Sequence, residues 1–225
     1  AETFMIVIQL PAIFAVMLYF RERLFPFHRD ADFLAACRLW IKIIVAFYPA
    51  ALLGVLLGDT IEAWFFNPFS IAVALVAGGG ALLYLESAPR ATRFEHVADI
   101  GIGVAFAIGV FQCLAMIPGT SRSAATIIGA MILGASRPAA AEFSFFLAVP
   151  TMLGATAYKT FKTGLDLSVG EWALIAVGGI TAFLTAYLVV AVFMNYISRN
   201  NFKPFGKYRI ALGVCILLLL LVGGL

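Results

Sequence analysis

One short stretch of the sequence combines the residue types that bind and transfer phosphate groups. Residues 118–130 read PGTSRSAATIIGA, with Arg122 between Ser121 and Ser123 and with Thr126 one helical turn further on. Apolar sequence flanks the stretch on both sides, so the arginine is expected at membrane depth, where a cation is costly and usually functional. A guanidinium suits phosphate because its planar fork donates two parallel hydrogen bonds.

A Pro-Gly pair directly before these residues predicts a break in a membrane helix. Pro118 cannot donate a backbone hydrogen bond, and Gly119 allows a turn. Thr120 or Ser121 can then cap a second short helix, whose first N–H groups and positive dipole end attract anions. Broken backbone at membrane depth is tolerated only where it is buried in protein or lines a wet cavity. The break is therefore predicted to bind phosphate.

Other interpretations of these polar residues are open. Hydroxyls in membrane helices often bond only the preceding turn, and Arg122 could snorkel or pair with an acid such as Glu142. Glu142 itself could orient the arginine, bind a metal or be an ordinary helix N-terminal charge. Gln9, in the first apolar stretch, could line the cavity or hold helices together. We predict three catalytic residues, Arg122, Ser121 and Ser123, and five substrate-binding residues: Gly119, Thr120, Thr126, Glu142 and Gln9.

The composition explains why these polar groups stand out. The chain has 225 residues, of which 63% are hydrophobic and 12% charged, and its mean hydropathy is +1.03. A soluble domain of this size has too little interior for so much apolar sequence, so the chain is predicted to be a polytopic membrane protein with one domain, 1–225. A lipid substrate and the bilayer are the expected partners, and no nucleic acid is expected. The three cysteines lack metal-like spacing.

The apolar stretches predict an all-α fold. A helix that crosses a bilayer needs about 20 apolar residues. Six stretches come close to or exceed this length: 3–20, 39–57, 67–85, 142–158, 171–196 and 208–225. A seventh region, 97–134, is too long for one span and too short for two, and the Pro-Gly break divides it. We predict that it is a re-entrant helix pair, which enters and leaves the membrane on one side.

The distribution of basic residues favours this re-entry. With 97–134 re-entrant, twelve of the 15 Lys and Arg residues fall on the cytoplasmic side, two fall outside and Arg122 lies in the membrane. A full crossing there would reverse the sides of the basic residues that follow, against the usual excess of Lys and Arg in cytoplasmic loops. The predicted location is the bacterial inner membrane, multi-pass, with the break toward the periplasm.

Two parts of the chain are weakly alike. AETFMIVIQLPAIFAV at 1–16 resembles AAEFSFFLAVPTMLGA at 140–155, and two further spans follow each. The predicted topology gives the two copies opposite directions, as in inverted repeats that place a site near the midplane. The repeats would be 1–86, incomplete, and 97–225. By this symmetry a first re-entrant pair, on the order of 40 residues, is expected to be missing before the first repeat.

The sequence also resembles a known family. PGTSRSAATI, followed by GASRPAAAEFSFFLAVPTMLGA, closely resembles the signature region of bacterial undecaprenyl-diphosphate phosphatases, the bacitracin-resistance family. AETFMIVIQLPAIFAVMLYFRERL and NPFSIAVALVAGGGALLYLE resemble two other helical units of that family. The resemblance implies an enzyme that hydrolyses undecaprenyl diphosphate to the monophosphate carrier used in cell-wall synthesis. The family's arginine and hydroxyls fall on Arg122, Ser121, Ser123 and Thr126.

The sequence departs from the family's pattern in one respect. The family carries a Glu-x-x-x-Glu motif, followed shortly by Ser and His, which supplies metal-linked acids and the proposed nucleophile or base. The motif is absent here, and neither His28 nor His96 follows such a glutamate pair. It is expected in the missing segment, together with ligands for a divalent metal, Mg or Ca. A chain without that segment is expected to be inactive.

The expected chemistry is phosphoryl transfer to water or to an enzyme nucleophile. Arg122 and the helix N-terminus would bind the diphosphate and stabilise charge in the transition state. The alternative is a transporter or flippase of a phosphorylated polyprenyl lipid, because inverted repeats with broken helices are also a transporter architecture. A polyprenyl diphosphate lipid is the expected partner in either case, with a second copy of the chain as a further expected partner.

Overall fold

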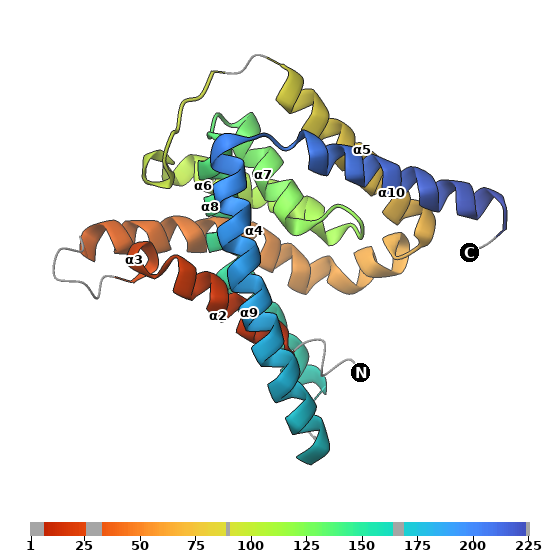
Figure 1. The fold of residues 1–225 in the computed structure, drawn as a ribbon, viewed down its shortest axis with the longest axis horizontal. Coiled ribbons are helices and arrows are strands. Elements are labelled where there is room, and N and C mark those ends of the chain that lie inside the picture. The colour runs from red at the N-terminus through yellow and green to blue at the C-terminus, as the bar shows by residue number, and fades with distance from the viewer. Residues whose placement is uncertain (1–6, 26–32, 89–90, 164–168, 224–225) are drawn as a thin grey trace. The chain divides into compact units, whose positions relative to one another are not determined.

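The structure, a computed structural model, describes residues 7–25, 33–88, 91–163 and 169–223. Nearly all of these residues are helical (Figure 1). The chain divides into two compact units, one formed by residues 1–44 and 145–196 and the other by residues 45–144 and 197–225. The described elements are α2 (Gln9–Tyr19), α3 (Arg21–Leu24), α4 (Phe33–Phe65), α5 (Pro68–Ser87), η1 (Val97–Asp99), α6 (Ile102–Gln112), η2 (Cys113–Met116), α7 (Arg122–Ile132), α8 (Arg137–Thr163), α9 (Val169–Arg199) and α10 (Lys203–Leu221).

The long apolar helices make this an integral membrane protein. Within the described residues, five helices are long and apolar enough to cross a bilayer, and they lie in α4, α5, α8, α9 and α10. The first expected span, 3–20, contributes only the 11 residues of α2 to the described part, and residues 1–6 lie outside it. The described structure therefore carries five candidate spans where the sequence predicts six.

The helices also extend further than the apolar stretches. The second expected span, 39–57, lies inside the 33-residue helix α4, because helical hydrogen bonding continues through polar turns that hydropathy excludes. Asn67 starts the next helix by accepting a hydrogen bond from the Ser70 N–H at 2.8 Å. As a result, several basic residues that lie outside the predicted spans stand on helices, among them Arg38, Lys203 and Lys207.

The region 97–134 forms a helical hairpin. α6 and α7 lie side by side (Figure 1), and a Cβ on Gly129 would lie 2.5 Å from the Phe111 ring. The two ends of the hairpin also meet, since the Arg93 N–H donates to the Gly134 carbonyl at 2.8 Å and the Ser136 N–H donates to the Phe94 carbonyl at 2.9 Å. The chain thus leaves the hairpin where it entered it.

Two helices pack beside the hairpin with their backbones in close contact. A Cβ on Gly79 of α5 would lie 2.7 Å from the Gly206 carbonyl of α10, and one on Gly206 would lie 3.0 Å from the Gly79 carbonyl. The preceding residue, Gly78, also faces α10, since a Cβ on it would lie 2.6 Å from the Arg209 Nη2, but a Cβ on Gly80 would meet nothing within 4 Å. α5 and α10 lie side by side (Figure 1), and both contact residues 119–120, α5 through Ile71 and α10 through Arg209.

In the other unit, aromatic rings fill the space between α2, α8 and α9. Phe20 packs on Phe146 with ring centroids 5.0 Å apart, and Phe145 packs edge-on against Phe193 at 5.7 Å. The indole of Trp40 in α4 donates to the Leu24 carbonyl at 2.9 Å. These contacts bury apolar rings within the protein while satisfying the indole N–H.

Candidate functional site

The predicted helix break is present and is built around Gly119. The helical backbone ends at Met116 and resumes at Arg122. Gly119 has φ +90°, and a Cβ on it would lie 2.5 Å from the Ile71 carbonyl oxygen of α5. Both the left-handed backbone and the close approach to a neighbouring helix require glycine. The turn that the Pro-Gly pair predicts is therefore confirmed.

Ser121 caps the helix that follows the break. Its hydroxyl accepts a long hydrogen bond from the Ala124 N–H at 3.5 Å, so of the two predicted caps it is Ser121 rather than Thr120. Ser121 also has φ 67°, and no other non-glycine residue in the described ranges has a positive φ. Such backbone strain persists only where the surroundings enforce it, and it is found preferentially at functional sites.

The first turn of α7 presents free hydrogen-bond donors. The backbone N–H groups of Ser121, Arg122 and Ser123 have no acceptor among the described residues. The hydroxyls of Ser121 and Ser123 are exposed and lie 3.2 Å apart. Free N–H groups and two hydroxyls at the positive end of an 11-residue helix form a site suited to an anion.

Arg122 adds a cation to this helix end. Its side chain is half-buried, and its Nη1 donates to the Ser144 carbonyl of α8 at 3.0 Å. That is the only acceptor for its guanidinium in the described part of the chain. The single contact fixes the side chain without neutralising it, because a carbonyl carries no net charge. Most of the guanidinium donors remain available to an anion.

Thr126 and Ser144 form hydrogen bonds with Arg122 and with each other. Thr126 is 0% exposed, and its Oγ1 lies 3.0 Å from the Arg122 carbonyl, which accepts its proton. The Thr126 and Ser144 hydroxyls are 2.7 Å apart, while the Ser144 carbonyl accepts from Arg122. In this structure the Thr126 hydroxyl is occupied by protein groups, and its predicted contact with substrate stays a prediction. Ser144 is not among the residues predicted from the sequence.

Arg209 is the second residue that sequence analysis missed. It stands on α10, is only 8% exposed, and its Nη2 donates to the carbonyls of Gly119 at 3.0 Å and Thr120 at 2.9 Å. The charge count placed it with the basic residues of the cytoplasmic side, but the structure shows it buried in a helix against the break. A cation inside the predicted span 208–225 was the available signal.

The comparison with known protein families identifies the chain's relatives. The sequence model of the family described as "Bacitracin resistance protein BacA" matches residues 1–215. The chain belongs to this family. It is 48% identical to the undecaprenyl-diphosphatase of Fusobacterium nucleatum subsp. nucleatum, over 97% of this chain and 85% of that protein. It is 44% identical to the undecaprenyl-diphosphatase 1 of Clostridioides difficile (strain 630), over 96% of this chain and 80% of that protein. It is also 44% identical to the undecaprenyl-diphosphatase of Enterococcus faecalis, over 97% of this chain and 82% of that protein.

Two further predicted site residues, Glu142 and Gln9, stand on other helices. Glu142 is buried in α8, two residues before Ser144. Gln9 is the first residue of α2, has an exposed side chain and belongs to the other compact unit. Their roles in substrate binding stay predictions.

A metal centre requires ligands beyond those at the break. In the ranges that the structure describes, no group of three or more His, Cys, Asp or Glu side chains could hold a metal ion. The donors around Arg122 are hydroxyls, N–H groups and one guanidinium, which bind anions rather than cations. These residues do not fit a divalent metal, so the Mg or Ca expected from the family resemblance stays a prediction.

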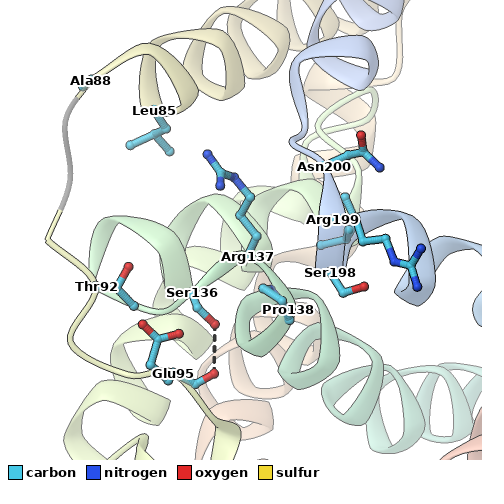
Figure 2. A pocket seen from close by; sticks show the side chains of 11 residues that line it. Leu85, Ala88, Thr92, Glu95, Ser136, Arg137, Pro138, Ser198, Arg199 and Asn200 are labelled. Carbon is cyan, nitrogen blue, oxygen red and sulfur yellow. Dashed lines mark hydrogen bonds between the residues drawn. The ribbon is translucent and has the colours of Figure 1, made fainter.

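A separate polar pocket lies at the ends of the hairpin and is not the predicted site. It has a volume of about 400 Å³ and lies between the C-terminal end of α5, the start of α8 and the link from α9 to α10. Figure 2 shows Thr92, Glu95 and Ser136 grouped together, with Arg199 pointing away from them. None of the predicted site residues lines it. Arg137, which does, is paired with the Glu86 carboxylate.

Proposed function

We propose that this protein is an integral membrane lipid pyrophosphatase that hydrolyses undecaprenyl diphosphate to undecaprenyl phosphate and inorganic phosphate. Its membership in the bacitracin resistance family and its 44–48% identity to proteins named undecaprenyl-diphosphatase support this reaction. The product is the lipid carrier of cell-wall synthesis, so the activity recycles that carrier. Recycling also gives bacitracin resistance.

The observation that carries the proposal is the set of donors at the first turn of α7. Arg122, three backbone N–H groups and the hydroxyls of Ser121 and Ser123 converge at one helix end, and the described residues engage only one guanidinium donor. We assign these groups to the diphosphate, whose charge they offset. Because hydrogen bonds within the protein already hold Arg122 and the start of α7, the donors need little reorganisation as charge develops in the transition state.

The reaction breaks one bond and forms one. The terminal phosphorus is attacked by water, or first by an enzyme nucleophile that water later displaces. The bond from that phosphorus to the bridging oxygen breaks, and the bridging oxygen leaves on the lipid monophosphate. Negative charge accumulates on the bridging oxygen and the transferred group, where Arg122 and the N–H groups of α7 stabilise it.

We place the break inside the membrane, in a re-entrant hairpin. The ends of the hairpin are hydrogen-bonded to each other, at Arg93 with Gly134 and at Phe94 with Ser136, which supports entry and exit on one side. Residues Ile102–Met116 form 15 residues of helix, about 22 Å at 1.5 Å per residue. Along the bilayer normal that length passes the midplane of a core about 30 Å thick.

The direction of this hairpin gives the side on which the site opens. Arg93 and Arg137 stand at its ends and favour the cytoplasmic side for them. The break would then face the periplasm of the bacterial inner membrane. The inverted repeat, a divalent metal held by acids of a separate segment and a homodimer stay parts of the proposal that rest on the sequence alone.

Phosphate release by the intact protein, purified in detergent, tests the proposed function. A prenyl diphosphate should yield one inorganic phosphate per lipid and a prenyl monophosphate, both quantified over time. A transporter would instead move a labelled prenyl phosphate across the bilayer of reconstituted vesicles without releasing phosphate. Transport without hydrolysis would exclude the enzyme assignment and favour the transporter.

A further inference from the structure

We propose that Arg209 is a positioning residue for the phosphate site, which it acts on through the backbone of the break. This inference rests on the proposed function. The Nη2 of Arg209 is shared among three carbonyl oxygens, those of Ala74 in α5 at 3.3 Å, Gly119 at 3.0 Å and Thr120 at 2.9 Å. One buried side chain thus joins α10, α5 and the break.

The geometry of the peptide bond links the contacts of Arg209 to the free N–H donors at the start of α7. In a trans peptide the C=O and the N–H of the next residue point in opposite directions. Arg209 holds the Thr120 carbonyl, so the Ser121 N–H is directed away from Arg209. Arg209 also holds the Gly119 carbonyl, and the Thr120 N–H correspondingly points the other way, to the Ile117 carbonyl at 3.1 Å. The guanidinium therefore sets the direction of one of the free donors at the start of α7.

The same contacts account for the strained backbone at Ser121. A non-glycine residue with φ 67° needs surroundings that enforce the conformation. Gly119, packed against the Ile71 backbone, limits the loop on one side of Thr120. Arg209 fixes the carbonyls of Gly119 and Thr120 directly before the strained residue. The capping hydrogen bond of Ser121, at 3.5 Å, is too long to do this alone.

The charge of Arg209 is not cancelled by its partners. Its acceptors are backbone carbonyls, its Nε has no hydrogen-bond partner and no carboxylate pairs with it among the described residues. A buried cation without an ion partner is costly, and an apolar residue of similar volume often stabilises a fold more. A role in an anion site would explain why an arginine is buried here, because its positive charge also favours binding of the anion.

A pair of glycine substitutions on α5 tests this without removing Arg209. A Cβ on Gly78 would lie 2.6 Å from the Arg209 Nη2, whereas a Cβ on Gly80 would meet nothing within 4 Å. Alanine favours helix over glycine at both positions, but only Gly78→Ala must displace the guanidinium. We expect Gly78→Ala to lower kcat for phosphate release by about 10- to 100-fold, the effect of a misplaced catalytic donor, with KM within about threefold. Gly80→Ala should match the wild type.

Hydrogen exchange measured by mass spectrometry provides a readout that does not need turnover. The amides of Ile117, Thr120 and Ala125 are hydrogen-bonded within or beside the break. Their peptides should exchange at least about tenfold faster in Gly78→Ala, because a loosened break opens more often, and at the wild-type rate in Gly80→Ala. If neither kcat nor exchange at the break changes in Gly78→Ala, the positioning role of Arg209 is refuted.

Direct substitutions complete the test. Arg209→Met removes every donor and should lower kcat about 100-fold, whereas Arg209→Lys keeps a cation and N–H donors and should restore at least a tenth of the activity. Lys207→Met, at an exposed position of the same helix, removes a charge away from the break and should leave kcat unchanged. Equal activity in Arg209→Met and Lys207→Met would overturn the proposal.

The two levels of the proposal fail in different ways. If the wild-type protein releases no phosphate from a prenyl diphosphate, the proposed function fails, and faster exchange at the break in Gly78→Ala still supports the positioning role. If the wild type is active and Gly78→Ala and Arg209→Met keep full kcat, the positioning role fails and the function stands. Should Arg209→Met not fold, Gly78→Ala against Gly80→Ala decides alone.

Discussion

The two ends of the α6–α7 hairpin each hold arginines, but the arginines have different partners. At the base, Arg137 binds the Glu86 carboxylate through Nε at 2.9 Å and Nη2 at 2.5 Å. Glu86 also accepts the Phe202 N–H at 3.0 Å. At the tip, Arg122 and Arg209 donate only to backbone carbonyls in the described part of the chain. The Arg137–Glu86 pair at the base is electrically neutral, whereas the two arginines at the tip have no carboxylate partner among the described residues.

This difference separates a structural ion pair from a binding site. The carboxylate at the base uses both of its oxygens on groups of the protein, which ties α5, α8 and the start of α10 together. At the tip, the carbonyls orient the guanidinium groups but leave their charge uncompensated. An external anion can supply that compensation. Substitutions at the tip should therefore change catalysis, and substitutions at the base should change stability.

The largest effect is expected for Arg122→Ala. It removes the cation nearest the free donors of α7, and arginines that stabilise phosphoryl transfer contribute about 10³- to 10⁵-fold in rate. Phosphate release from a prenyl diphosphate should fall at least about 1,000-fold, while the thermal unfolding midpoint changes little. Arg122→Lys should recover only part of the activity because Lys lacks the planar fork.

The matched control for this substitution is Arg21→Ala, at an exposed position of the short helix α3. It removes the same charge from the surface and should leave phosphate release unchanged. Activity of Arg122→Ala near that of Arg21→Ala would mean that the uncompensated charge at the tip has no catalytic role.

A smaller loss is expected when the turn of the break is changed. Gly119→Ala places a Cβ at φ +90°, 2.5 Å from the Ile71 carbonyl oxygen, so the break must shift away from α5. A shift of about 1 Å in a catalytic donor reduces the rate about 100-fold, and kcat should fall by that order. Backbone strain of this kind also costs about 1–3 kcal/mol of folding stability, which denaturant titration would measure.

Gly101→Ala is the comparison for Gly119→Ala. Gly101 precedes α6 with φ −75°, and a Cβ on it would have nothing within 4 Å. Its kcat and unfolding free energy should stay at the wild-type values. If Gly119→Ala behaves in the same way, the close approach of the break to α5 does not determine the site.

Much of the tip could be predicted from local sequence, because its signals lie within a few residues of one another. Pro118 and Gly119 predict the break, and the hydroxyls of Thr120 and Ser121 predict a cap, which the structure assigns to Ser121. Arg209 and Ser144 could not be assigned in this way, since they are 89 and 22 residues away from the groups they contact. Only the packing of α10 and α8 brings them to the break, and their hydrogen bonds to backbone carbonyls leave no pattern of paired charges.

The ends of the helices and the ion pair at the base also could not be predicted from local sequence. Hydropathy located the apolar centres of α4 and α10, but it could not extend them through Arg38 or Lys203, because helical hydrogen bonds tolerate polar side chains at exposed positions. At the base, the pairing of Glu86 with Arg137 joins residues 51 apart in sequence. Neither residue could be distinguished from an ordinary loop or terminal charge before α5 and α8 were placed.

The smallest effect on activity is expected at the base, in Glu86→Gln. The side chain of Glu86 is 1% exposed and that of Arg137 is 42% exposed, so solvent screens part of their attraction. Unfolding free energy should fall by about 1–2 kcal/mol, less than for a fully buried pair, while kcat per folded molecule stays within about twofold. A double-mutant cycle with Arg137→Gln, followed by denaturant titration, isolates the coupling between the two side chains. A loss of kcat comparable to that of Gly119→Ala, at unchanged stability, would contradict the division between a structural base and a catalytic tip.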